Sequence, residues 1–270
     1  MKVTVLIDNI EKDNIKGQWG LSFFIEYEGK KILLDTGSDK LFSKNALKLG
    51  IDLGETDYAV LSHAHYDHAN GMAEFFSVNK KADFYLQKKC RENCIGRRFI
   101  FMKYIGIKRG TLGKFAERIK YVDGSKEITE GVYLIPHNTP CLEEIGRKEG
   151  LLKISEGRLC ADNIDHEQSL VFDTEKGLVI FNSCSHGGAD NIIREISEFF
   201  PEKKIYALIG GLHLYKRNAD EVKALAARIE ETAVEKLITG HCTGDKAYRV
   251  LKECLGDNVQ QLYAGMQIEI

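Results

Sequence analysis

The chain has 270 residues, of which 43% are hydrophobic and 29% charged, and its formal net charge is −2. These values suit a globular α/β protein with one sizeable core and exclude a disordered or low-complexity chain. No run approaches the roughly 18 apolar residues of a transmembrane helix. The N-terminus lacks the apolar stretch and cleavage site of a signal peptide, so we expect a cytoplasmic protein.

The seven cysteines are odd in number, and none of them forms a Cys-x-x-Cys pair. This argues against a disulfide framework or a structural zinc knuckle and suits a reducing compartment.

Hydrophobic periodicity and turn residues predict hairpins in the first half of the chain and β-α alternation in the last third. The pattern suggests two mixed sheets with helices outside them, in one domain spanning residues 1–270. We expect strands at 3–8, 21–27, 31–35, 58–62, 82–86, 119–122, 132–135, 169–173, 178–182, 204–209, 237–239 and 262–270. We expect helices at 39–49, from 71, at 190–200, from the capping pair Asn218 and Glu221, and at 247–255.

Four good metal ligands fall within six residues directly after the expected strand at 58–62. They are His63, His65, Asp67 and His68. Imidazole and carboxylate suit zinc, iron or manganese, and a loop at a strand end can point the first two histidines at one ion and the other two side chains at a second. A solvated polar loop is the plain alternative. The spacing therefore predicts a dinuclear metal site, with zinc as the expected metal.

This stretch resembles the H-x-H-x-D-H signature of the metallo-β-lactamase superfamily, which implies a four-layer αββα sandwich of two mixed sheets. Residues 32–37, Ile-Leu-Leu-Asp-Thr-Gly, resemble the strand of this family that ends in D-T-G. The resemblance implies that Asp35 accepts an N–H from a ligand histidine and fixes its tautomer, although Asp35 could simply start a turn. Residues 238–241 resemble the late strand that supplies a histidine to the second metal, which implies that role for His241.

The middle ligands are less regular, because Cys184 stands where the family places a bridging aspartate. Three assignments remain open. In order of preference they are a ligand at His186, a bridging thiolate at Cys184 and a ligand at His166. Cys184 could equally be a buried, unreactive thiol. The motifs around Cys184, at 210–214 and at 241–244 resemble the branch of dihydropterin–aminobenzene-ribofuranosyl-phosphate synthase-like proteins.

These features predict a hydrolase in which water shared by two metals attacks a carbonyl or phosphoryl centre. Asp67 is expected to take part in catalysis, and His213 is a candidate proton donor or oxyanion partner, unless it is only a satisfied histidine near the core. A condensing synthase and a nuclease-type phosphodiesterase are the enzymatic alternatives, and a metal-binding module is the non-enzymatic one.

The segment from Lys88 to Lys120 contains eleven Lys or Arg against two Glu. We expect it to be irregular or helical and to form a basic insert or lid over the cleft, with its apolar residues, among them Phe99, Ile100 and Phe101, packed on the domain. A solvated face is the alternative. We expect a small anionic, phosphate-bearing substrate, no membrane and no nucleic acid as partners, and leave a homodimer open. Paired cations suit a phosphate or carboxylate; these are Arg97, Arg98, Lys108 and Arg109.

Overall fold

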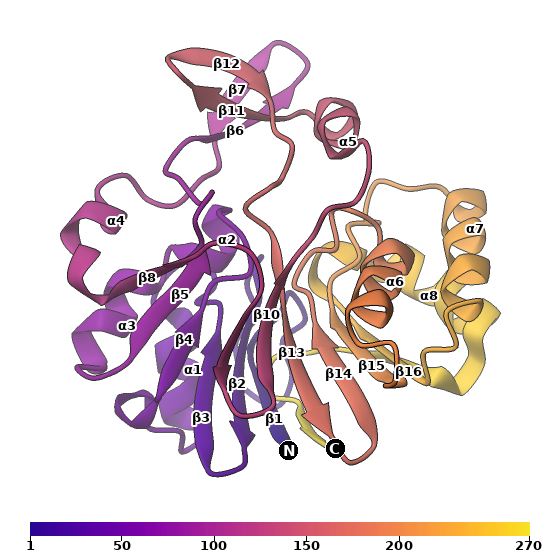
Figure 1. Ribbon diagram of the computed structural model, residues 1–270, viewed down its shortest axis with the longest axis horizontal. Helices are drawn as coiled ribbons and strands as arrows, with labels where there is room; N and C mark the ends of the chain where they lie inside the picture. Colours follow the sequence, from indigo (N-terminus) through magenta and orange to yellow (C-terminus); the bar gives the residue numbers. More distant parts are fainter.

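The computed structural model describes residues 1–270 and contains two seven-stranded sheets packed face to face (Figure 1). The strands of the first sheet, in spatial order, are β18 (Gln267–Glu269), β1 (Lys2–Ile7), β2 (Ser22–Tyr27), β3 (Lys30–Leu34), β4 (Tyr58–Val60), β5 (Asp83–Gln87) and β8 (Ile119–Val122). The strands of the second sheet are β17 (Val259–Gln261), β16 (Lys236–Thr239), β15 (Ile205–Gly210), β14 (Gly177–Phe181), β13 (Gln168–Thr174), β10 (Val132–Pro136) and β9 (Lys126–Thr129).

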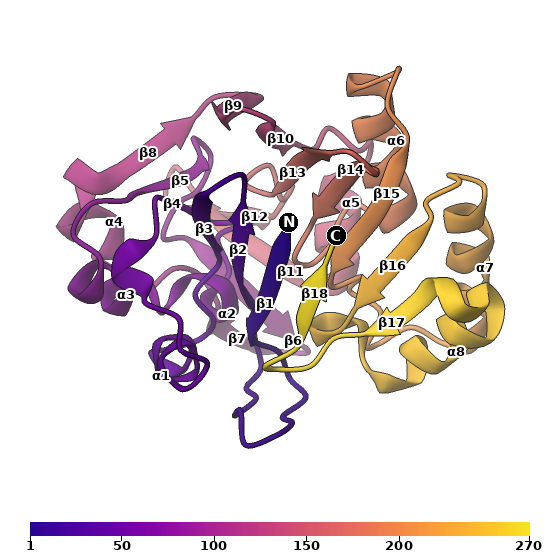
Figure 2. The same ribbon diagram turned by 90° about the horizontal axis from the view of Figure 1, so that it is seen from below.

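Helices cover the outer face of each sheet, which gives four layers (Figures 1 and 2). The first sheet carries α1 (Leu41–Lys48) and α3 (Met72–Val78), and the second carries α6 (Ala189–Phe199), α7 (Ala219–Glu230) and α8 (Asp245–Leu255). The αββα sandwich that the resemblance implies is therefore confirmed. No helix is both long and apolar enough to cross a lipid bilayer.

Strand β14 illustrates why the buried strands are apolar along their whole length. Val179 and Phe181 point into the core between the two sheets, whereas Leu178 and Ile180 pack under the helices of the second sheet. Successive side chains of a strand point to opposite faces, so a strand covered on both faces needs apolar residues at every position.

A third sheet lies at the edge of the sandwich that is remote from the two termini (Figure 1). Its order is β12 (Arg158–Ala161), β11 (Leu151–Ser155), β6 (Cys94–Arg98) and β7 (Phe101–Tyr104), and α5 (Leu142–Glu149) leads into it. We call these four strands with α5 the cap. We expected the segment from Lys88 to Lys120 to be irregular or helical. This was wrong for β6 and β7, which lie in that segment and form an antiparallel hairpin.

The hairpin tip also differs from the expected packing. Phe99 and Ile100 are 85% and 86% exposed, and Phe101 is exposed as well, so they do not hold the cap on the sandwich. Ile107, which follows the hairpin, is buried in the core under the first sheet.

Candidate metal centre and cleft

The candidate site lies where the carboxyl ends of several strands meet, between the two halves of the sandwich. Strand β4 runs parallel to β3, and β14, β15 and β16 run parallel to one another, so the segments after them emerge on one edge. Four non-glycine residues in these segments have left-handed backbones, which are strained for such residues. They are Asp35 (φ 59°), Ser185 (φ 51°), His213 (φ 51°) and His241 (φ 47°).

Three imidazoles form a first group, in which one ligand atom of each lies within 4.8 Å of the others. They are His63, His65 and His186. The Nε2 atoms of His63 and His65 and both ring nitrogens of His186 are buried and have no hydrogen-bond partner. Buried polar atoms are nearly always paired, so these orphaned nitrogens indicate a missing ligand. Metal coordination would satisfy them.

Asp67, His68 and His241 form a second group next to the first. The Nε2 atoms of His68 and His241 are 3.3 Å apart, and Asp67 Oδ2 lies 3.6 Å from His241 Nε2. Zn–N bonds of about 2.0–2.1 Å in a tetrahedral site place ligand nitrogens about 3.3–3.4 Å apart. The spacing of this group therefore fits a tetrahedral ion.

Asp35, for which the family resemblance implies a contact with a ligand histidine, lies directly behind His68. Its Oδ2 atom is 2.8 Å from His68 Nδ1, and it also accepts the hydroxyl of Ser62. The same hydroxyl lies 2.8 Å from His63 Nδ1. One carboxylate and one hydroxyl thus orient two imidazoles with their Nε2 atoms toward the centre, as is usual around metal ligands.

Sequence reasoning missed Asp8 and Asn9, which hold His241. Asp8 Oδ2 accepts the backbone N–H of His241 at 2.9 Å, and Asn9 Oδ1 lies 3.1 Å from His241 Nδ1. These residues follow β1, which ends at the same edge of the sheet as β3. A polar pair at the end of a buried strand was the signal that could have identified them.

The electrostatics of the site favour the neutral form at four of the candidate ligand imidazoles. His68 is the exception: burial lowers its pKa, but the charges of Asp35 and Asp67 outweigh burial and raise it to about 9. Burial, followed by the nearby imidazoles, lowers the pKa of His63, His65, His186 and His241 well below the usual value. A neutral imidazole keeps a free lone pair, which is the form that binds a metal. The donor set therefore fits divalent metal ions.

Cys184 lies between the two groups. Its sulfur belongs to a cluster with His63 and His68, to a second with His241 and Cys242, and to a third with His186 and His213. Burial raises the pKa of Cys184, and contact with Cys242 raises it further. Burial opposes ionisation of Cys242 as well, but hydrogen bonds with Cys184 and His213 outweigh it and lower the pKa of Cys242.

His166 is placed differently from His186. Its Nδ1 atom accepts the backbone N–H of Ala64 at 3.2 Å, so the neutral ring carries its proton on Nε2, which lies 3.3 Å from Asp162 Oδ2. Cys94 Sγ lies 3.8 Å from the same nitrogen. One nitrogen of His166 is thus used to hold the backbone between His63 and His65, and the other faces a carboxylate.

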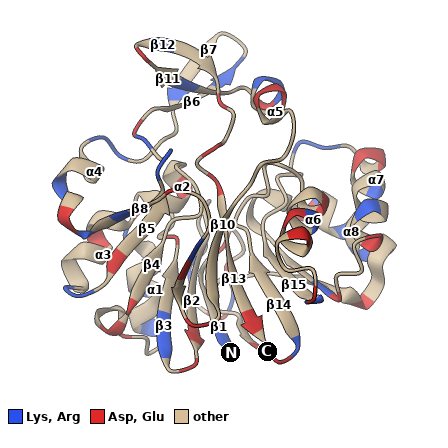
Figure 3. Cartoon of the chain, in the orientation of Figure 1, with Lys and Arg blue, Asp and Glu red and all other residues tan.

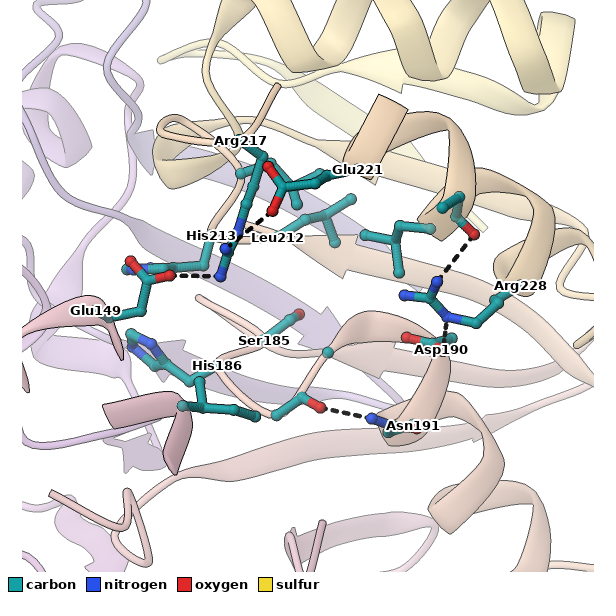
Figure 4. A pocket seen from close by; sticks show the side chains of 16 residues that line it. Glu149, Ser185, His186, Asp190, Asn191, Leu212, His213, Arg217, Glu221 and Arg228 are labelled. Atoms are coloured by element: carbon teal, nitrogen blue, oxygen red, sulfur yellow. Dashed lines mark hydrogen bonds and ion pairs between the residues drawn. The ribbon is translucent and has the colours of Figure 1, made fainter. Parts of the chain in front are cut away.

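His213 follows β15 and packs against His186, with the two ring centroids 4.4 Å apart. Its Nδ1 atom is buried without a partner, and its Nε2 atom is 3.8 Å from Glu149. On the far side of His186 and His213 is a second cavity of about 380 Å³, where Arg217 pairs with Glu149 and Arg228 with Asp190 (Figure 4).

A cleft of about 550 Å³ opens from the metal groups toward the cap. The side chains at its inner end include His65, Asp67, Cys184, His186 and His241. Of the predicted substrate cations, Arg97 and Arg98 line the cleft, whereas Lys108 and Arg109 do not. Lys103 and Lys216, which the sequence did not single out, also line it.

Comparison with known proteins identifies the family. A family model described as the metallo-β-lactamase superfamily matches residues 20–145. The crystal structure of a metal-dependent hydrolase of the β-lactamase superfamily superposes with a TM-score of 0.84 at 29% identity, covering 100% of this chain and 99% of that one. The chain belongs to the metallo-β-lactamase superfamily, whose members bind divalent metals.

Within that superfamily, the chain is 31% identical over 271 residues to the 7,8-dihydropterin-6-methyl-4-(β-D-ribofuranosyl)-aminobenzene-5'-phosphate synthase of Methanocaldococcus jannaschii, covering 93% of this chain and 90% of the relative. The branch that the sequence motifs indicate is thus confirmed. The fold also matches Zn²⁺-bound PqqB from Methylobacterium extorquens, with a TM-score of 0.59 at 8% identity and complete coverage of both chains.

Proposed function

We propose that this chain is a metal-dependent enzyme that acts on a small anionic, phosphate-bearing metabolite, with hydrolysis as its reaction. The observation that carries this proposal is the composition of the cleft. Candidate metal ligands lie at its inner end, and four cations line its walls, namely Arg97, Arg98, Lys103 and Lys216. Figure 3 shows cationic residues on the β6–β7 hairpin of the cap above the sandwich.

In this proposal the chain holds two ions. One is bound by His63, His65 and His186, and the other by Asp67, His68 and His241, with Cys184 between them. Nitrogen, oxygen and sulfur donors together suit zinc. Bound ions of this kind activate water near neutral pH and polarise a carbonyl or phosphoryl oxygen.

The remaining residues bind and orient the substrate. The guanidinium groups of Arg97 and Arg98 supply paired donors for phosphate oxygens. The His213 ring packs against His186 at a tilt and has an unpaired Nδ1 atom, so it is placed to give a proton to a leaving group or to hydrogen-bond an oxyanion. Asp67 occupies the inner end of the cleft, where the attacking water must be held.

A second candidate reaction is a condensation like that named for the synthase of M. jannaschii. Two observations favour it. Aromatic rings line the cleft beside the cations, including Trp19, Tyr66 and Tyr215, and such rings suit a flat cyclic substrate. The cavity of about 380 Å³ shares His186, His213 and Glu149 with the cleft, so two substrates could meet at this wall. Product analysis with phosphoesters alone and with paired substrates distinguishes the two reactions.

The cleft cations provide the first prediction. The double variant Arg97→Ala/Arg98→Ala should raise KM for an anionic phosphoester about thirtyfold or more, because each lost charge-assisted contact costs about 1–1.5 kcal/mol and two contacts are lost. Turnover and metal content should change little, and the dependence of KM on salt should weaken. Steady-state kinetics on p-nitrophenyl and bis-p-nitrophenyl phosphate over a series of salt concentrations measure this.

The matched control is Lys108→Ala/Arg109→Ala, which removes the same charge from the same segment outside the cleft. This variant should keep the KM of the unmodified protein. Equal kinetics for the two double variants would show that the cap charges do not hold the substrate.

A further inference from the structure

Two cysteine side chains meet beside the candidate metal ligands. Cys184 follows β14 and Cys242 lies in the short helical turn after β16, yet their sulfur atoms are only 3.4 Å apart. Both side chains are buried, and both line the cleft of about 550 Å³, so a small molecule in the cleft can reach them.

The surrounding backbone holds Cys242 in this position. The N–H of His213 donates to its sulfur at 3.2 Å. A side-chain carbon at Gly211 would lie 2.5 Å from the same sulfur, so glycine leaves the room that the thiol occupies. The loop after β15 therefore holds the sulfur of Cys242 with backbone contacts, opposite Cys184 in the loop after β14.

We infer that Cys184 and Cys242 form a reversible redox site, in which a peroxide of the hydrogen peroxide class converts the two thiols to a disulfide. A disulfide requires an S–S distance of about 2.05 Å, so the sulfurs must approach by about 1.4 Å. The thiolate of one cysteine attacks a peroxide oxygen, which gives a sulfenic acid and releases water after protonation. The second thiol then attacks the sulfenic sulfur, the S–S bond forms and a second water leaves. Two thiols and one hydrogen peroxide thus give one disulfide and two waters.

Closure of this bond would change the metal centre. Cys184 Sγ lies 3.4 Å from His68 Nε2, and in the disulfide it no longer offers a thiolate to an ion. This consequence rests on the proposed function, whereas formation of the disulfide does not. Bound metal should in turn protect the pair, because a coordinated thiolate is a weaker nucleophile.

The test uses the full-length, metal-free protein with the exposed cysteines Cys141, Cys160 and Cys254 replaced by serine. After treatment with one equivalent of hydrogen peroxide, peptide mapping should find a Cys184–Cys242 cross-link that dithiothreitol reverses. Loading with Zn²⁺ first should slow its formation at least tenfold. The variant Cys242→Ser should give no cross-link, and the control Cys90→Ser, which removes another buried thiol, should still give it.

Recovery of both thiols unmodified, or of sulfinic acid at either cysteine without the cross-link, overturns the inference. Elemental analysis of the oxidised protein tests separately whether the disulfide changes metal binding. If the cross-linked protein binds as much zinc as the reduced protein, the redox site is supported and Cys184 is not a metal ligand.

Discussion

At the scale of single residues, hydrogen bonds already made by a histidine decide whether it can bind a metal. Both ring nitrogens of His186 are buried without a partner, whereas His166 already accepts the N–H of Ala64 and faces Asp162. A ligand nitrogen must have a free lone pair. His186 is therefore the better candidate for the ion proposed at His63 and His65.

The corresponding prediction compares two alanine variants. His186→Ala should lose about one ion per chain and most of the activity. His166→Ala should keep both ions, although the loss of its buried hydrogen bonds should lower the free energy of unfolding by roughly 1–3 kcal/mol. Elemental analysis and thermal unfolding measure the two effects. If the unmodified protein and His186→Ala bind the same amount of metal, His186 is not a ligand, and His166 is the remaining candidate for that role.

Local spacing was enough to predict the cluster from His63 to His68, because its side chains lie on one short segment, formed by the loop after β4 and the helical turn α2 (Tyr66–Ala69). The choice between His166 and His186 depends on contacts that spacing does not contain. The turn before His166 includes Ile164 with a left-handed backbone (φ 52°), and it directs the imidazole toward Asp162. Tertiary hydrogen bonds of this kind leave no periodic pattern in the sequence.

At the scale of elements, the cap is the part of the fold that the sequence described least well. Strands β6 and β7 pair with each other and, through β11, with β12, yet the hairpin tip from Phe99 to Met102 is exposed. Alternation of apolar and polar residues predicts strands only where one face is buried. In the sandwich, most of the strands expected from apolar runs are present, but β9 and β17 were not predicted, and the strand expected at 262–270 is only β18 at Gln267–Glu269.

The attachment of the cap provides a prediction at this scale. A side-chain carbon at Gly146 of α5 would lie 1.9 Å from the backbone oxygen of Asp162. Gly146→Ala should therefore push α5 away from the end of β12, lower the free energy of unfolding by about 1–3 kcal/mol and speed amide hydrogen exchange in the cap.

Gly113→Ala is the matched control, because no atom from outside its own helical turn lies within 4 Å of the added carbon in α4 (Thr111–Lys114). Alanine is a better helix former than glycine, so this variant should be as stable as the unmodified protein or slightly more stable. Similar stability and exchange rates in both variants would mean that tight packing of α5 does not hold the cap.

At the scale of the whole molecule, the two sheets bring chain segments that are far apart in sequence to one edge. Asp8, Asp35, His63, Cys184 and His241 each follow a different strand, and all of them lie near the candidate metal centre. The four-layer fold could be predicted because the motif at 63–68 resembles a family with one architecture. The third sheet could not, since nothing in that motif specifies what covers the cleft.

The proposed metal centre holds two ions, so the number of ions bound per chain is the measurement that decides it. After loading with Zn²⁺ and removal of free metal, elemental analysis should find close to two ions per chain. Asp67→Ala should hold about one, because Asp67 lies within 3.6 Å of His241 Nε2 and 4.0 Å of His68 Nε2 in the second group. Asp123→Ala, which removes an exposed carboxylate paired with Lys88, should still hold two. A protein that holds no metal, or a single ion that is retained when Asp67 is lost, would contradict the dinuclear site.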